Sequence, residues 1–305
     1  MLTIAFNIIL LFIAPFLMLG MIKKTKAFWG GRRGVSIFQP FLDFIKLLKK
    51  NCVYSETTSW IFKLAPVINL ATVLFAAIFV PMINGVCIYN IPYSFVLFAY
   101  ILGLGKFFML LSSLDTGSSF EGMGASREAC FSTIVEPAFF ISMASIAILT
   151  GNDTLNSLRQ IMDKTGSYGL LFVGLMVITL FIMLLIESCR VPVDDPATHL
   201  ELTMIHEVMV LDNSGPDLAL INWSSGIKML LLSSLIINLV LPLSLPLWGA
   251  IGAFVLLLLI ISILIGTLES AIARLRMTHI FEFVFIMTIT ALLILALVTY
   301  KIYGN

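Results

Sequence analysis

The chain has 305 residues, of which 60% are hydrophobic and only 11% are charged. A soluble domain carries about a quarter charged residues, and long apolar runs need lipid as their solvent. The composition therefore excludes a soluble protein with a short anchor and predicts one membrane domain over residues 1–305. A formal net charge of +1 provides no basic field for nucleic acid.

Eight apolar segments of about 20 residues are long enough to cross a bilayer as helices. They lie near residues 2–21, 62–83, 92–114, 128–150, 168–187, 217–245, 247–269 and 279–302. We therefore expect an all-α membrane protein with eight transmembrane helices. Positive charges follow the first segment rather than precede it, which favours a retained helix over a cleaved secretory signal.

The positions of Lys and Arg predict the orientation of these helices. The connection 22–61 carries eight of these residues, and the loops at 115–127, 188–216 and 270–278 add four more. The connections on the opposite side carry only Arg159 and Lys164. The positive-inside rule then places the N-terminus outside and the charged loops in the cytoplasm.

Within the first of these connections, residues 40–50 are expected to form an amphipathic helix in the membrane interface. Apolar side chains recur there at i, i+3, i+4 and i+7 and share one helical face: Phe41, Phe44, Ile45 and Leu48. Asp43, Lys46 and Lys50 take the other face, and Pro40 suits the first turn. The alternative is a cytoplasmic helix packed on its own loops, which we disfavour because no soluble core lies nearby.

Several ionised side chains fall inside the predicted spans or at their ends. Each costs about 2.5–3.5 kcal/mol at the bilayer centre, so it should face protein or water. Glu136, beside Pro137, lies well inside the fourth segment, and Lys106 lies inside the third. Glu187 and Glu269 lie at the cytoplasmic ends of the fifth and seventh. These groups form either a chain of titratable groups leading into the membrane or ion pairs, such as Glu136 with Lys106, that only fix helix packing. For Glu136 we favour a role in the series of titratable groups, and for Lys106 we keep both interpretations.

Two further charged residues, Lys228 and Glu282, lie in the sixth and eighth segments. Their long side chains can reach the membrane interface by snorkelling, which favours a structural role.

The stretch "LLIESCRVPVDDPATHLELTMIHEVMVLD" at 184–212 gathers nine acidic, basic or histidine residues beside one membrane boundary. Asp194 or Asp195 can cap a helix on which His199 and His206 share a face. His206-Glu207 lacks the second His that a zinc-binding helix needs, and the four cysteines form no CxxC pair. We therefore expect no metal. Proton transfer or docking fits the histidines because His titrates near neutral pH, although a solvated loop explains either one alone.

Four segments at the cytoplasmic ends carry a family resemblance: "RRGVSIFQPFLDFIKLLKK" (32–50), "LSSLDTGSSFEGMGASREACFSTIVEP" (111–137), "ESCRVPVDDPATHLELTMIHE" (187–207) and "LESAIARLRM" (268–277). Together they resemble the eight-span membrane subunit shared by energy-converting NiFe hydrogenases and the proton-pumping NADH:quinone oxidoreductase (respiratory complex I), where it forms the subunit-1 family. The resemblance covers nearly the whole chain.

The loop after the fifth segment separates two branches of that family. In the quinone-reducing branch it usually reads PFD followed by several closely spaced glutamates. Here it reads "PVDD", Ala197 and His199 occupy two of the glutamate positions, and only Glu201 remains. This pattern, with "LDTGSSFEGMGASRE", is similar to the hydrogenase-type branch that includes formate hydrogenlyase membrane subunits, in which no quinone is required.

The resemblance implies a non-catalytic subunit of a prokaryotic inner-membrane oxidoreductase complex, which docks a redox arm and couples electron transfer to H⁺ or Na⁺ translocation. The implied partners are hydrogenase-type large and small subunits, an iron–sulfur subunit and antiporter-like membrane subunits. The 4Fe–4S clusters, and a NiFe centre where one is retained, would lie on those partners, with no cofactor on this chain.

By position in the family motifs, the acidic relay comprises Glu136, Glu187, Glu201 and Glu269. Four more residues are candidates for the same ion path: Lys106, His199, His206 and Glu207. Charged residues at the cytoplasmic ends are candidates for docking the redox arm: Arg32, Arg33, Asp43, Asp115, Arg127, Arg190, Asp194, Asp195, Arg274 and Arg276.

Three other functions compete with this one. The first is a quinone-binding subunit of an NADH:quinone-oxidoreductase-like complex, with a quinone cavity between the interfacial helix and the spans. The second is a structural anchor whose antiporter-like partners do all the pumping. A stand-alone transporter is disfavoured because no inverted repeat is visible.

Overall fold

The computed structural model describes residues 2–161, 168–194, 204–241 and 246–303, and within these ranges it contains helices and no strand. Eight helices there are long and apolar enough to cross a membrane. They are α1 (Leu2–Trp29), α3 (Trp60–Ala77), α4 (Ser94–Asp115), α5 (Ser119–Thr150), α7 (Gly169–Glu187), α9 (Gly215–Val240), α10 (Leu247–Ala271) and α11 (Met277–Tyr303). The all-α fold with eight transmembrane helices is thus confirmed.

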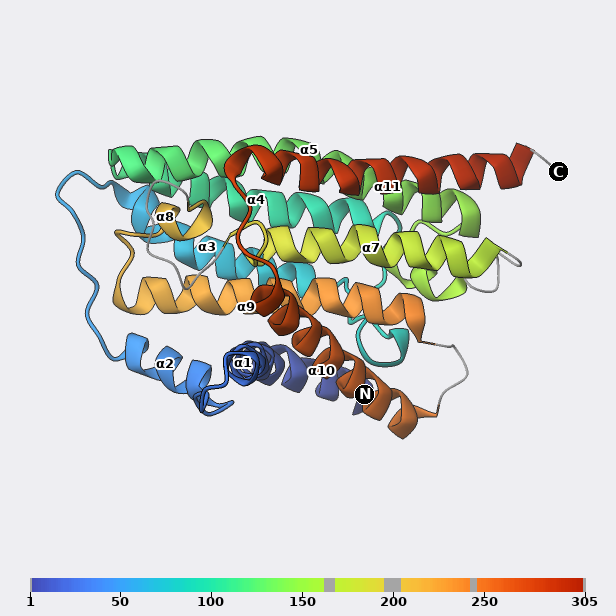
Figure 1. Cartoon of the computed structure of the whole chain (residues 1–305), viewed down its shortest axis with the longest axis horizontal. Helices are drawn as coiled ribbons and strands as arrows, with labels where there is room; N and C mark the ends of the chain where they lie inside the picture. The colour runs from blue at the N-terminus through green and yellow to red at the C-terminus, as the bar shows by residue number, and fades with distance from the viewer. Residues whose placement is uncertain (1, 162–167, 195–203, 242–245, 304–305) are drawn as a thin grey trace.

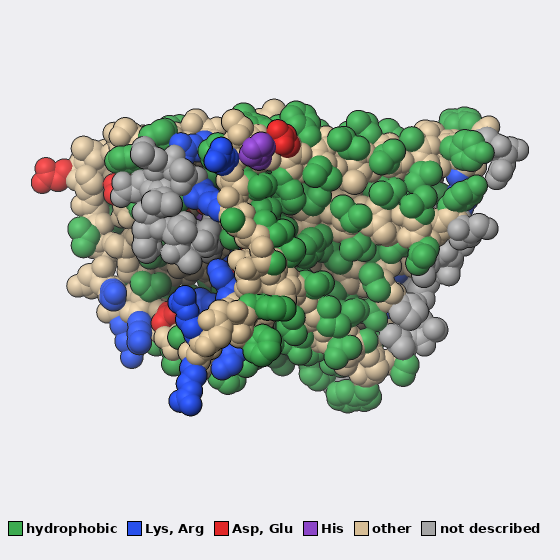
Figure 2. All heavy atoms as spheres, in the orientation of Figure 1, with side chains coloured by type: hydrophobic (Ala, Val, Ile, Leu, Met, Phe, Trp, Pro, Cys, Tyr) green, Lys and Arg blue, Asp and Glu red, His purple; other side chains and the backbone are tan. Residues whose placement is uncertain are grey.

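Within the same described ranges, four short helices connect or flank these spans: α2 (Gln39–Leu48), α8 (His206–Met209) and the 3₁₀ turns η1 (Ile83–Gly85) and η2 (Leu155–Gln160). The helices α5 and α11 run side by side, α4 and α7 lie beside them, and α10 crosses the bundle obliquely against α1 (Figure 1). Lys and Arg gather at the end that holds α2, α8 and the connections 30–59 and 272–276, which we call the charged end (Figure 2).

Helix α9 lies at the centre of the bundle. Over its most apolar 18 residues 78% are buried, against 33% in α1, α10 and α11. It packs against α1, α3, α7 and α10, so its polar side chains meet protein rather than lipid. Asn69 Nδ2 donates to Ser224 Oγ at 2.7 Å, and Asn238 Nδ2 donates to the Pro81 carbonyl at 2.7 Å. Such hydrogen bonds hold helices together where lipid provides no hydrophobic drive.

The ends of the helices differ from the ends of the apolar segments. Helix α1 continues to Trp29, because the lysines after the apolar run do not stop a helix, and it ends where Gly31 takes φ 62°. Helix α5 begins at Ser119, after Gly117 with φ 70°, well before the apolar segment at 128–150. Hydropathy marks where a helix meets lipid, whereas glycines with positive φ mark where the backbone stops being helical.

The helix predicted at 40–50 is present as α2, with Pro40 in its first turn. Its Phe44 ring lies 5.3 Å from that of Phe16 and 5.4 Å from that of Trp223, whereas Leu42 and Leu48 stay exposed. Part of its apolar face therefore packs on α1 and α9. A position of α2 in the membrane interface stays a prediction.

Candidate functional site

A buried ammonium group joins three helices near the charged end. Lys106 Nζ of α4 donates to Glu187 Oε1 of α7 at 2.6 Å and lies 3.6 Å from Glu128 Oε1 of α5. It also donates to Ser132 Oγ at 3.0 Å. The side chains of Lys106 and Glu187 are only 9% and 6% exposed. We call Lys106, Glu128, Glu187 and Glu136 the Lys106 cluster.

The pairing within this cluster differs from the one that the sequence suggested. Glu136 is not the direct partner of Lys106, although the two attract each other electrostatically. Glu136 lies instead across a small cavity of about 20 Å³ whose lining also includes Lys106 and Glu187. That volume is enough for one water molecule. The second partner of Lys106 is Glu128, which was missed because it stands at the very start of the apolar segment 128–150 and reads as an end residue.

A second buried carboxylate, that of Glu269, lies where α10 meets α1. Its side chain is fully buried, with Oε2 2.9 Å from Lys26 Nζ and Oε1 3.4 Å from Arg190 Nη1. One turn earlier, a Cβ on Gly266 would lie 2.7 Å from Thr25 Cβ. Glycine there permits the close approach of α10 and α1 that brings Lys26 to the carboxylate.

Asp194 organises the segment between these two clusters. Its Oδ1 lies 3.1 Å from Arg274 Nη2, and its Oδ2 accepts hydrogen bonds from the backbone N–H groups of Ile205 and His206 at 3.1 and 2.9 Å. Asp194 thus holds the start of α8, whereas the helix predicted directly after it lies outside the described residues. The predicted candidates Asp195, His199 and Glu201 lie outside the described residues.

A cavity of about 360 Å³ opens between α1, α2, α8, α9 and α10. One wall is aromatic, with the rings of Phe16 and Trp223 stacked 6.2 Å apart. The lining also has a charged part, which includes Arg190, Glu207 and Glu269. The volume lies within the range of small-molecule sites, about 300–1,000 Å³. This is the place at which the quinone alternative expected its cavity.

His206 lines the same cavity. Burial, reinforced by the nearby ammonium of Lys228, lowers the pKa of His206 to about 4. The imidazole is therefore neutral at pH 7, and the expectation that it titrates near neutral pH is wrong. A neutral imidazole still has one donor and one acceptor nitrogen, so it can pass a proton without holding it.

Lys228 lies in the middle of α9 and is only 7% exposed. The snorkelling interpretation is therefore wrong for this residue, because α9 is surrounded by protein. Its charge instead acts on Glu187 and His206. Glu282, in contrast, is exposed, and its Oε2 lies 3.0 Å from His279 Nδ1, so its position in the membrane interface stays a prediction.

Most of the described residues predicted to dock a redox arm bind other residues of this chain. Asp115 Oδ2 accepts from the Ser59 N–H at 2.7 Å, Arg127 Nη1 donates to the Met204 carbonyl at 2.8 Å, and Asp43 Oδ1 accepts from Gln39 Nε2 at 2.8 Å. As described above, Arg190, Asp194 and Arg274 are held in ion pairs. Among the candidates that the structure describes, three are exposed at the charged end: Arg32, Arg33 and Arg276.

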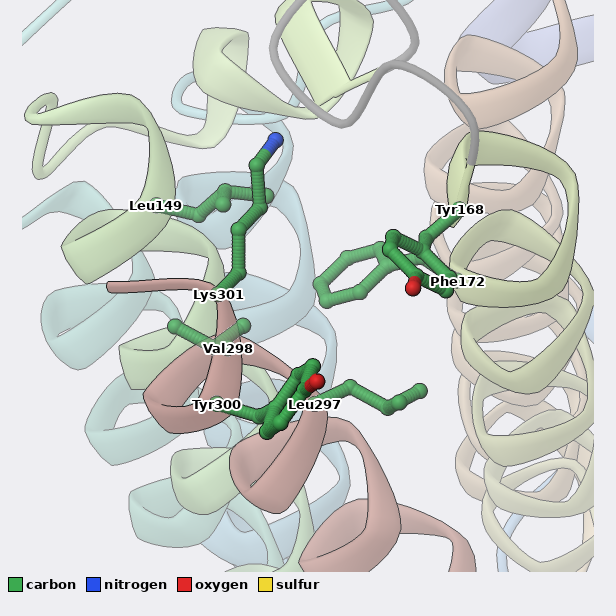
Figure 3. A pocket seen from close by; sticks show the side chains of 7 residues that line it. All are labelled: Leu149, Tyr168, Phe172, Leu297, Val298, Tyr300 and Lys301. Carbon is green, nitrogen blue, oxygen red and sulfur yellow. The ribbon is translucent and has the colours of Figure 1, made fainter. Parts of the chain in front are cut away.

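At the opposite end of the bundle, α5, α7 and α11 enclose a cavity of about 20 Å³ (Figure 3). Its lining is mainly apolar and aromatic, including Phe172, Leu297 and Tyr300. Among the described residues, no group of three or more His, Cys, Asp or Glu side chains is placed to hold a metal ion.

The sequence of this chain is similar to those of known membrane-complex subunits. The family model described as NADH dehydrogenase matches residues 2–300. Hydrogenase-4 component C of Escherichia coli (strain K12) is 31% identical over 235 residues, which is 77% of this chain and 73% of that protein. Formate hydrogenlyase subunit 4 of the same strain is 25% identical over 282 residues, covering 88% of this chain and 89% of the relative.

A solved structure shares the fold. It is a chain of the membrane-bound sulfane sulfur reductase, an archaeal respiratory membrane complex. The TM-score is 0.78 at 19% identity, and the match covers 95% of this chain and 96% of that one.

Proposed function

Because the chain belongs to the NADH dehydrogenase family, as its four segments predicted, we propose that it is the coupling membrane subunit of a hydrogenase-type oxidoreductase complex. In this role it is a multi-pass membrane protein that receives a redox arm at its charged end and helps to translocate H⁺ or Na⁺. The names of the two E. coli relatives support the hydrogenase-type branch. The metal centres belong to partner subunits, and the charged end faces the cytoplasm.

The observation that carries the proposal is the Lys106 cluster. One buried ammonium meets carboxylates from two other helices, Glu187 and Glu128, with Glu136 across a cavity that has room for one water. Lys106, even with Lys228 acting on Glu187, does not balance three carboxylates, so the cluster can bind or release a proton as nearby charges change. A unit charge about 10 Å away contributes about 1.7 kcal/mol at an effective dielectric constant of about 20, more than tenfold in proton affinity.

The large cavity supplies a route from the charged end to this cluster. Glu269 and Arg190 line it, and His206 lines it too while responding to the charges of Lys106 and Glu187. In the proposed path, protons pass from the cavity by way of neutral His206 to Glu187 and then toward Glu136. A change of charge in the redox arm alters the proton affinity along this path.

The test replaces Glu187 or Glu136 by Gln in the complete complex reconstituted into liposomes, with the redox rate and ion uptake measured together. Gln keeps the size of the side chain and removes its ability to ionise. We expect redox turnover to persist while ion uptake falls at least tenfold. Glu282→Gln, on exposed α11 and outside the cluster, serves as the matched control. Ion uptake at the wild-type rate in both cluster variants would refute the relay and favour the function of a structural anchor.

One observation favours a second candidate, a quinone-binding subunit. The cavity of about 360 Å³ with its wall of Phe16, Phe44 and Trp223 has the size and apolar lining that a quinone ring needs. A photoreactive quinone analogue added to the complex distinguishes the two functions. Labelling of the Trp223 peptide that excess quinone prevents, together with quinone-dependent turnover, would favour the second candidate. We expect turnover that does not depend on quinone.

A further inference from the structure

One exposed face of α5 differs from the other lipid-accessible surfaces of the bundle. Its exposed residues recur every three or four positions and are small or polar: Ser126, Cys130, Thr133 and Glu136. The exposed residues of α10 are apolar instead, as lipid contact requires: Val255, Leu256, Ile260, Ile263 and Leu264. Small and polar residues are typical of contacts between transmembrane helices.

Glu136 is the residue on this face that lipid tolerates least. It lies 17 residues from Ser119 and 14 from Thr150, about 26 and 21 Å along the helix, so it is near the middle of α5. Its side chain is exposed and makes no hydrogen bond or ion pair within 4.0 Å to any described residue. Against hydrocarbon an ionised carboxylate costs about 2.5–3.5 kcal/mol on the most lenient scale.

A groove beside Glu136 leads to the Lys106 cluster. The small cavity lies between α4 and α5, with Ala99 and Gly103 on the α4 side and Lys106 and Glu187 further in. A Cβ on Gly103 would meet no atom within 4 Å, so this side of the groove is open. Small residues beside an open groove let the backbone of another helix approach closely.

We propose that this face of α5, with the groove beside α4, is the docking surface for one transmembrane helix of a second membrane subunit. The partner helix carries a cationic or hydrogen-bond-donating side chain opposite Glu136. Lipid offers no such donor at mid-membrane depth. A second copy of this chain in a symmetric contact would set two Glu136 side chains against each other, and like charges repel. The inference rests on the proposed function only in that the chain works inside a membrane complex.

The first test is a photo-cross-link in the intact complex. Thr133 is replaced by p-benzoylphenylalanine, the complex is irradiated in its membrane, and the adducts are mapped by mass spectrometry. Leu256 on α10, 60% exposed among apolar neighbours, carries the same probe as control. We expect the Thr133 probe to join an apolar segment of a co-purifying membrane subunit. That segment should carry Lys, Arg, His, Asn, Gln, Ser or Thr within one turn of the attachment point, and the yield should exceed the Leu256 protein adduct at least fivefold. Lipid adducts alone, a second copy of this chain, or a soluble subunit would each overturn the proposal.

The second test reverses the charge. Glu136→Lys places a cation opposite the partner's donor, so we expect at least tenfold less of that subunit per chain after purification. Glu136→Gln keeps an accepting oxygen and should retain the subunit, as should the exposed control Glu282→Lys. Wild-type subunit content in Glu136→Lys would overturn the proposal. These readouts are independent of ion uptake, so a failure of the relay and a failure of the docking surface are distinguishable.

Discussion

Removing the ammonium of Lys106 is the sharpest test of the Lys106 cluster. Lys106→Met keeps the length of the side chain and deletes the charge that lies 2.6 Å from Glu187 and 3.6 Å from Glu128. Both partner carboxylates have side chains no more than 12% exposed. Breaking a buried pair by removing one partner costs about 3–5 kcal/mol, because the other charge stays buried and uncompensated. We therefore expect Lys106→Met to destabilise the complex by about that amount at pH 7.

The assay is the thermal retention of the detergent-solubilised complex, followed for four variants in a double-mutant cycle. Glu187→Met removes the nearer carboxylate, so the double variant should regain part of the stability lost in Lys106→Met, while Glu128 still lacks its cation. Lowering the pH should also rescue Lys106→Met, because the stranded carboxylates can take up a proton. Glu282→Gln combined with Lys106→Met should give additive losses, since Glu282 lies outside the cluster. A loss below about 1 kcal/mol in Lys106→Met, or no recovery in the double variant, would refute the view that this pair is buried and coupled.

Three further predictions concern the charged end. Gly266→Val should lower the stability of the complex by about 1–3 kcal/mol, because the larger side chain forces α10 away from Thr25, and it should weaken the Lys26–Glu269 pair. Gly252→Val on the same helix is the control. A Cβ there meets no atom within 4 Å, so its effect in the same thermal assay should be near zero. Because the pKa of His206 falls from 6.5 to about 4 on folding, the unfolded chain binds more protons between these values, and stability should rise with pH across that window. His206→Asn should flatten this rise in thermal scans at pH 4.5 and 7, and an unchanged slope would contradict a buried neutral imidazole. Asp194→Ala should release the backbone N–H groups of Ile205 and His206 and lower stability by about 1–3 kcal/mol. Proteolysis near residue 205 should then become faster, whereas the control Asp153→Ala should leave its rate unchanged.

The number of spans was predictable because a membrane helix needs about 20 apolar residues, and eight such runs exist. The rotation of each helix about its own axis was not predictable. A helix embedded in lipid is apolar all round, so no 3.6-residue period shows which side faces protein. This is why Lys106 was matched with Glu136, the other charge deepest in a span, rather than with Glu187 and Glu128.

Contacts that involve the backbone were equally unpredictable from the sequence. Nothing in the sequence around Gly266 distinguishes it from Gly252, yet one meets α1 and the other meets no neighbour. Asp194 was expected to cap a helix directly after it, which lies outside the described residues, and its two hydrogen bonds to backbone N–H groups reach residues eleven and twelve positions ahead. The closure of this loop depends on where α7 and α9 place its two ends, and local sequence does not encode that placement.

The central position of α9 also bears on how the chain enters the membrane. Among the eight spans it has the lowest mean hydropathy, 1.5, and it carries Lys228 and Asn238 at buried positions. Alone in lipid these groups would have no partner, whereas beside α3 the Asn238 amide reaches the Pro81 carbonyl. We therefore expect α9 to take its place in the membrane only after the earlier helices are there to pack against it. A chain that lacks residues 1–81 should integrate α9 poorly.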